Sequence, residues 1–85
     1  MNYIKKRRMY EIASKLVTDI PRISECKYRF KLGAEELHGS NQYGTFRLQR
    51  KDDFISLKVQ ILEDDEDDDS HWSNRYEEFS LSQLR

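Results

Sequence analysis

Residues 53–69 read DFISLKVQILEDDEDDD, and this stretch decides how the rest of the chain is interpreted. Ile55, Leu57, Val59 and Ile61 recur at every second position, which is the period of a β-strand with one buried face. Directly after this pattern come seven acidic residues, 63–69, without interruption. A strand therefore leads into a block of negative charge that is too costly to bury.

Upstream of this stretch, residues 3–19 have the pattern of an amphipathic helix. Apolar side chains follow the i, i+3, i+4, i+7 spacing at Met9, Ile12, Ala13, Leu16 and Val17, and then Ile20. Pro21 is expected to end the helix, because the residue before a proline is disfavoured in the α region.

Three further strands are predicted around the central one. Residues 24–32 alternate between an apolar set and a basic set, and residues 43–50 resume strand character before a tight turn at Lys51-Asp52. Residues 33–44 are interpreted as a connection with one helical turn at 34–37, since they contain all three glycines of the chain. The spacing of Trp72 and Tyr76 within residues 70–79 fits either a strand or one face of a helix, and we interpret this segment as a fourth strand. Ser80 and Gln83 have the S-x-x-Q spacing of a capping box, which predicts a short closing helical turn.

These elements predict an α+β fold in a single domain, residues 1–85. The N-terminal helix is expected to pack on a three- or four-stranded antiparallel sheet. The helix–strand–strand–strand–helix order resembles the double-stranded-RNA-binding domain in outline. That family has a basic entry to its second helix, where this chain has its acidic run.

Composition restricts the classes of protein to consider. The 85 residues include one cysteine, Cys26, which excludes a disulfide framework and suggests a reducing compartment. No apolar run approaches the ~18 residues of a membrane span, so we expect a cytoplasmic protein with no membrane partner. The formal net charge of −1 hides an asymmetry. Residues 1–50 hold eleven Lys/Arg and five Asp/Glu, a balance of +6, whereas residues 51–85 hold four and eleven, a balance of −7.

The acidic half suggests the first functional hypothesis, a non-enzymatic inhibitor or modulator whose surface imitates a nucleic acid. A regular row of carboxylates resembles the charge of a phosphate backbone, and a nuclease, polymerase or defence effector with a basic groove would bind it. Phage-encoded anti-defence proteins and immunity proteins of nuclease toxins combine this size and charge. The predicted partner-binding residues are Asp64, Asp65, Asp67, Asp68, Asp69, Trp72 and Glu77.

The alternative hypothesis is a small nucleic-acid-binding module that uses the basic half. Its predicted contacts are Lys5, Lys6, Arg7 and Arg8 of the helix with Lys27 and Arg29 of the first strand. If the helix covers one face of the sheet, these two clusters need not lie on the same surface.

Catalysis and metal binding are not expected from the sequence. His38 and His71 have no nucleophile at a recognisable spacing, and with Cys26 they match no zinc spacing, so we predict no enzyme, no cofactor and no metal. Trp72 either closes the core or stands exposed as an anchor for a partner. A sheet face bearing Phe54 and Leu62 could form a homodimer, so the chain is expected to be a monomer or a homodimer.

Overall fold

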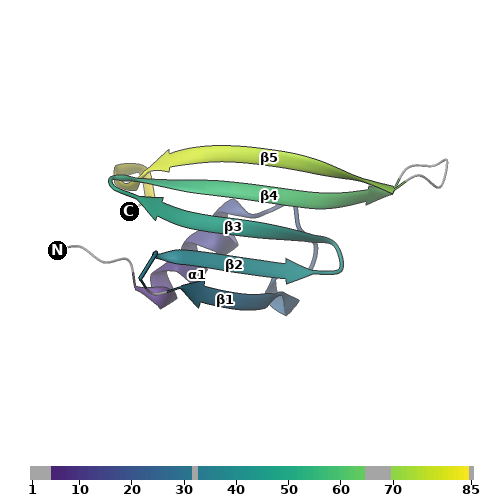
Figure 1. The fold of residues 1–85 in the computed structure, drawn as a ribbon, viewed down its shortest axis with the longest axis horizontal. Helices are drawn as coiled ribbons and strands as arrows, with labels where there is room; N and C mark the ends of the chain where they lie inside the picture. The colour runs from purple at the N-terminus through teal and green to yellow at the C-terminus, as the bar shows by residue number, and fades with distance from the viewer. Residues whose placement is uncertain (1–4, 32, 65–69, 85) are drawn as a thin grey trace.

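The computed structural model describes residues 5–31, 33–64 and 70–84 and has an α+β fold. One helix, α1 (Lys6–Leu16), and a 3-10 turn, η1 (Ile23–Glu25), precede five strands. The strands are β1 (Lys27–Lys31), β2 (Glu36–Asn41), β3 (Gly44–Lys51), β4 (Phe54–Asp64) and β5 (Ser70–Ser80), and a 3-10 turn, η2 (Leu81–Leu84), follows them. All neighbours are antiparallel, and the order in the sheet is the order in the chain. The helix lies behind one face of this sheet (Figure 1).

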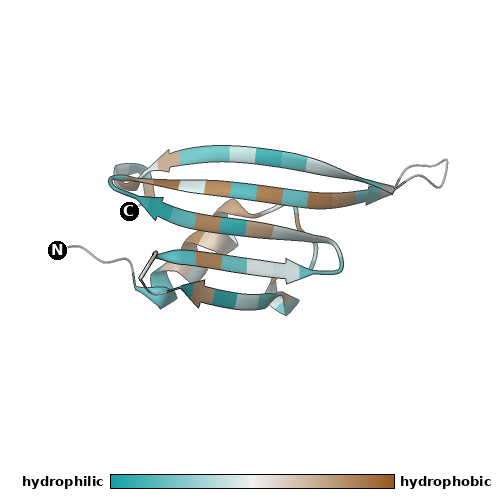
Figure 2. Ribbon diagram, in the orientation of Figure 1, coloured by the Kyte–Doolittle hydropathy of each residue, from teal (hydrophilic) through white to brown (hydrophobic). Residues whose placement is uncertain are grey.

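The core forms between α1 and the sheet face that it covers. The central alternation is confirmed, because Ile55, Leu57 and Val59 are buried, and brown and teal residues alternate along β4 (Figure 2). The buried apolar side chains are Met9, Ile12, Ala13, Val17, Ile20, Cys26, Leu37, Phe46, Leu48, Ile55, Leu57 and Val59. Cys26 is thus the small buried hydrophobe that its position in the alternation indicates, and burial raises the pKa of its thiol.

The predicted number of strands is wrong, because residues 36–41 form β2 in place of the expected connection. The helical turn predicted at 34–37 is also wrong: Glu35 has a left-handed backbone (φ 46°), and strand β2 begins at the next residue. This strand was missed because its sequence, ELHGSN, has only one large apolar residue. With five strands and a 3-10 turn in place of a second helix, the element order also departs from the double-stranded-RNA-binding outline.

The predicted ends of the helix and of the last strand agree only in part with the structure. Helix α1 ends at Leu16, three residues before the predicted end at 19. The closing turn is 3-10 and contains half of the predicted capping box, since the backbone N–H of Ser80 donates to Oε1 of Gln83 at 3.2 Å. The predicted hairpin between residues 43–50 and the central strand is confirmed, but its two-residue loop is Asp52-Asp53 and not Lys51-Asp52, because Lys51 still pairs with Phe54.

Strand β2 requires a glycine at position 39, because a side chain there would collide with a buried ring. A Cβ placed there would meet the buried Phe46 ring, with Cζ only 2.7 Å away. We expect Gly39→Ala to lower the free energy of unfolding by about 1–3 kcal/mol, because the ring has little room to move in a packed core. Urea denaturation measures this.

Gly33→Ala is the matched control. A Cβ at this position would have nothing within 4 Å of it, and the φ of Gly33 is not positive. This variant should be neutral or slightly stabilising. Equal destabilisation by both variants would show that the Phe46 contact is not the cause.

Candidate functional site

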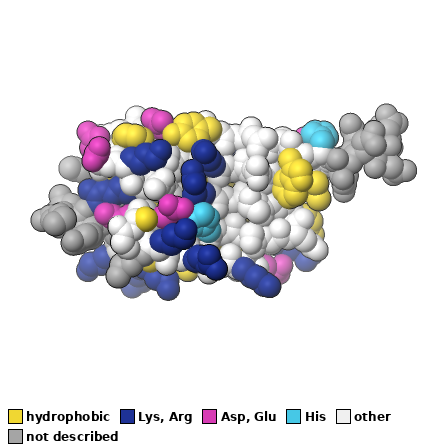
Figure 3. Space-filling model, viewed as in Figure 1, with side chains coloured by type: hydrophobic (Ala, Val, Ile, Leu, Met, Phe, Trp, Pro, Cys, Tyr) yellow, Lys and Arg dark blue, Asp and Glu magenta, His cyan; other side chains and the backbone are white. Residues whose placement is uncertain are grey.

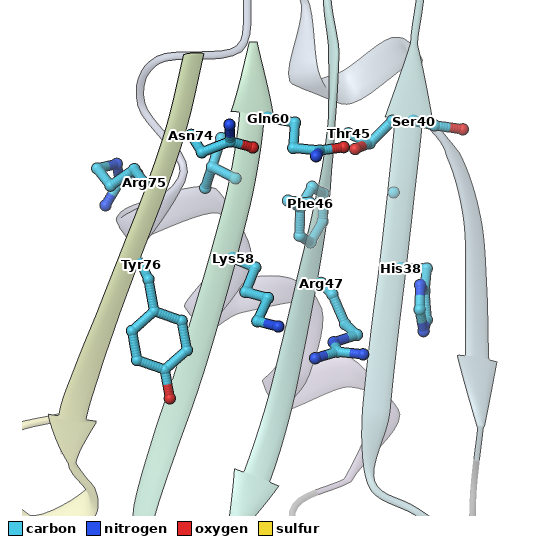
Figure 4. A pocket seen from close by; sticks show the side chains of 12 residues that line it. His38, Ser40, Thr45, Phe46, Arg47, Lys58, Gln60, Asn74, Arg75 and Tyr76 are labelled. Atoms are coloured by element: carbon cyan, nitrogen blue, oxygen red, sulfur yellow. The ribbon is translucent and has the colours of Figure 1, made fainter. Parts of the chain in front are cut away.

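The face of the sheet opposite α1 is open, and its side chains form rows across the strands. One row, which we call the central row, joins residues that are direct neighbours in the strand register: Arg29, His38, Arg47, Lys58 and Tyr76. The adjacent row is Lys27, Ser40, Thr45, Gln60 and Asn74. Figure 4 shows the members of the two rows on β2 to β5 at two successive levels of the strands. These residues line a hollow of about 690 Å³.

The open face carries an excess of positive charge. Strand alternation assigns six Lys/Arg residues to it against three acidic residues within the described strands: Lys27, Arg29, Lys31, Arg47, Lys51 and Lys58 against Glu36, Glu78 and, at the far end of β4, Asp64. The dark blue side chains gather over this face in Figure 3. Glu36 is committed to a neighbour, because Nε2 of His38 donates to its carboxylate.

Arg47 and Lys58 are the electrostatic centre of the row. They are direct cross-strand partners, and like charges in that relation destabilise a sheet. Neither side chain forms an ion pair with any residue in the described ranges 5–31, 33–64 and 70–84. The fold therefore keeps an unfavourable cation pair that an anionic ligand would relieve.

Two aromatic side chains stand on the same face. Trp72 is 52% exposed and Tyr76 is 48% exposed, the exposed large hydrophobic residues of the described chain. They are four residues apart on β5, which places them roughly 13 Å apart along the strand. The hydroxyl of Tyr76 donates to Oε1 of Glu78 at 2.7 Å, and this hydrogen bond raises the pKa of Tyr76. Because the Trp72 side chain is half exposed on the open face, it does not close the core.

Of the partner-binding residues predicted from the sequence, only Asp64, Trp72 and Glu77 lie within the described chain. Asp64 is the last residue of β4, and Asp65, Asp67, Asp68 and Asp69 lie outside the described residues. Glu77 lies on the helix side of β5 and is ion-paired with Arg75, whereas Trp72 lies on the open face.

The predicted basic surface is divided between the two sides of the sheet. Lys27 and Arg29 are exposed on the open face, but α1, with Lys5 at its N-cap, lies behind the sheet. Arg8 is engaged within the fold, since it bonds Glu11 at 3.2 Å and donates to the carbonyl of Leu84. The helix cations therefore do not extend the surface formed by β1.

The central row was not predicted from the sequence as a site. Alternation alone assigns Arg47 and Lys58 to the polar faces of their strands. Their juxtaposition, and that of His38 and Arg29, depends on strand register and on β2, which was not predicted. The signal available in the sequence was a basic residue at the centre of each of two adjacent strands.

Arg75 connects the edge strand β5 to the helix. Its guanidinium makes a two-pronged contact with Asp19, with Nε–Oδ2 at 3.0 Å and Nη2–Oδ1 at 2.9 Å, and Nη2 also donates to the carbonyl of Leu16. It thereby satisfies the last carbonyl of α1. The hydrogen bond from Arg75 lowers the pKa of Asp19 and raises that of Arg75, and partial burial opposes both shifts.

The described residues hold no cluster of three or more His, Cys, Asp or Glu side chains able to bind a metal ion. His71 pairs with Glu63 at 3.2 Å, and His38 with Glu36.

Within residues 5–31, 33–64 and 70–84, no helix is long and apolar enough to cross a membrane. No protein-family model, curated protein or solved structure matches the chain.

The Asp19–Arg75 contact predicts a pH-dependent stability. Because the pKa of Asp19 is lowered in the folded state, its contribution is complete above the ordinary value of 3.8 and is lost as the pH falls through the folded pKa. Asp19→Asn should cost roughly 1–3 kcal/mol at neutral pH. It should also weaken the acid dependence below about pH 4. Urea denaturation of both proteins between pH 2 and 7 measures the difference, and parallel curves would contradict the assignment.

Proposed function

We propose that the protein is a binding module for single-stranded nucleic acid, which lies across the open face of the sheet. The observation that supports this most directly is the pair of cations, Arg47 and Lys58, held opposite each other with neither side chain in an ion pair within the described chain. Phosphates would supply the missing negative charge. This proposal keeps Lys27 and Arg29 from the predicted basic surface and replaces the helix cations by those of β3 and β4.

The arrangement of charge and aromatic groups favours a nucleic acid over a simple anion. Proteins that bind single strands combine a positive track for the backbone with aromatic side chains on which bases stack. Here the central row crosses four strand spacings, roughly 19 Å, and ends at the exposed ring of Tyr76. An open sheet can stack unpaired bases, whose faces are hidden in a duplex.

The acidic end of β4 is distant from the central row compared with the screening length at physiological salt. Lys58 and Asp64 are six residues apart on β4, which is roughly 20 Å. The screening length is about 8 Å at an ionic strength of 0.15 M. Repulsion from the acidic end of β4 is therefore strongly reduced at the central row.

The acidic-surface inhibitor remains a separate hypothesis. Most of its predicted contacts lie outside the described residues, and Glu77 is occupied by Arg75. Reversing Asp65, Asp67 and Asp68 to lysine would remove an inhibitor's contacts but leave nucleic-acid binding by the central row intact.

Neutralising the central row should separate binding from stability. We expect Arg47→Gln with Lys58→Gln to weaken binding of a single-stranded oligonucleotide at least about tenfold, because two phosphate contacts are lost. The dependence of log K on log salt should become shallower by about 1.4, at about 0.7 per contact. The free energy of unfolding should stay equal or rise by roughly 0.2–1 kcal/mol, since a like-charge pair is removed. Fluorescence anisotropy and urea denaturation measure the two effects.

The matched control is Lys5→Gln with Lys6→Gln, which removes the same charge from the helix side. This pair should leave affinity nearly unchanged. An equal loss in both double variants would mean that net charge governs binding, and no measurable binding by the unmodified protein would refute the proposal.

Tyr76 should contribute through its ring. We expect Tyr76→Ala to cost about 1–3 kcal/mol of binding free energy, the value of one stacked base, whereas Tyr76→Phe keeps the ring and should bind like the unmodified protein. Trp72 is the only tryptophan and lies on the same face, so its fluorescence reports binding directly. If Tyr76→Phe and Tyr76→Ala weaken binding equally, the contact with the ligand is made by the hydroxyl and not by the ring.

A further inference from the structure

Strand β5 is an open edge of the sheet, and the register determines which of its backbone groups face outward. The backbone N–H of Leu62 donates to the carbonyl of Tyr43, and that of Leu81 donates to the carbonyl of Asp53, both at 3.0 Å. In an antiparallel ladder, these bonds mean that the even-numbered residues of β4 direct their backbone N–H and C=O groups toward β3. The odd-numbered residues of β5 direct theirs toward β4. The even-numbered residues of β5 therefore direct their N–H and C=O groups away from the sheet.

This outward row is long and little protected. Of its N–H groups, that of Ser80 is occupied by Gln83, and those of Trp72, Asn74, Tyr76 and Glu78 have no partner within the described chain. Edge strands are usually shortened, bulged or interrupted by proline to prevent pairing with another chain. By contrast, β5 has eleven residues, an unbroken register with β4 and no proline. At the other edge, β1 has only five residues, three of them Lys or Arg.

We propose that β5 pairs with β5 of a second copy, antiparallel, with Tyr76 on the two-fold axis, so that two five-stranded sheets become one of ten strands. In this register Tyr76 faces Tyr76 of the second copy, and Asn74 faces Glu78. A closed two-fold contact of this kind uses the same patch on both copies.

The charges of β5 select this register from its neighbours. With Tyr76 on the axis, Arg75, which already contacts Glu77 of its own strand, also lies opposite Glu77 of the second copy, so that the two arginines and two glutamates alternate in sign across the axis. A shift that puts residue 75 on the axis sets Arg75 against Arg75, and a shift that puts residue 77 there sets Glu77 against Glu77. A shift to residue 74 loses the Arg75–Glu77 pairs and brings Glu77 and Glu78 closer to the acidic residues of the other copy.

The proposed dimer aligns the two central rows. Because Tyr76 ends the row of each copy, the rows meet at the axis and continue as one across ten strands. The dimer contact itself does not depend on nucleic-acid binding, and it is tested in the absence of any ligand.

Cysteine cross-linking tests the contact and its register together. Residues directly opposite on such a pair have Cα atoms about 5.5 Å apart, which is within the range of a disulfide. Tyr76→Cys should therefore form covalent dimers rapidly under mild oxidation. In Asn74→Cys and Glu78→Cys the two introduced thiols would be roughly 13 Å apart along the strands, so these variants should not. The buried Cys26 is common to all three, and the unmodified protein is the background control.

Solution mass provides the second measurement. Light scattering after gel filtration should give twice the monomer mass of 10.3 kDa, with dissociation on dilution. Glu77→Lys should shift the protein toward monomer with an unchanged circular-dichroism spectrum, because lysine would then face Arg75 of the second copy. A monomer at every concentration overturns the proposal. Cross-linking of Asn74→Cys or Glu78→Cys as fast as Tyr76→Cys overturns it as well.

Discussion

The molecule depends on one constraint, which is that a single helix can cover only one face of its sheet. Helix α1 has eleven residues and is about 16 Å long. The apolar side chains of the strands gather on the side it covers, where Leu37, Leu48 and Leu57 are fully buried. No described part of the chain covers the other face, so its side chains must be compatible with water. That requirement explains why the rows on the open face are polar, but it does not require them to be basic.

Strand β5 is held by different forces from the rest of the sheet. Its residues on the helix side are mostly polar, with Phe79 as the apolar exception. Arg75 supplies the main tertiary link by binding Asp19 and the carbonyl of Leu16. The edge strand is therefore attached to the end of the helix through Arg75, to the core through Phe79 and to β4 through its ladder. Because that ladder uses only one side of its backbone, the other side is available for a partner.

Periodicity in the sequence was sufficient for every element with a strong apolar pattern. The alternation of Ile55, Leu57 and Val59 and the helical spacing of Met9 and Ile12 correspond to buried faces. Strand β2 was not predictable in this way, because Gly39 lacks a side chain in order to accommodate the Phe46 ring. A requirement set by a residue in another strand leaves no periodic signal. The central row was inaccessible for a related reason, since pairing between strands determines which cations become neighbours.

Charge is segregated along β4, and this separation allows one small chain to carry both a basic face and an acidic run. Lys58 lies near the middle of the strand, and Asp64 lies at its end. Screening makes the two regions nearly independent at physiological salt and couples them at low salt, where the screening length reaches about 30 Å. In the proposed dimer the β5 strands run in opposite directions, so the acidic ends of the two copies lie far apart and the basic rows meet at the axis. The arrangement that avoids repulsion between the acidic ends is therefore also the one that joins the two basic rows into a single surface.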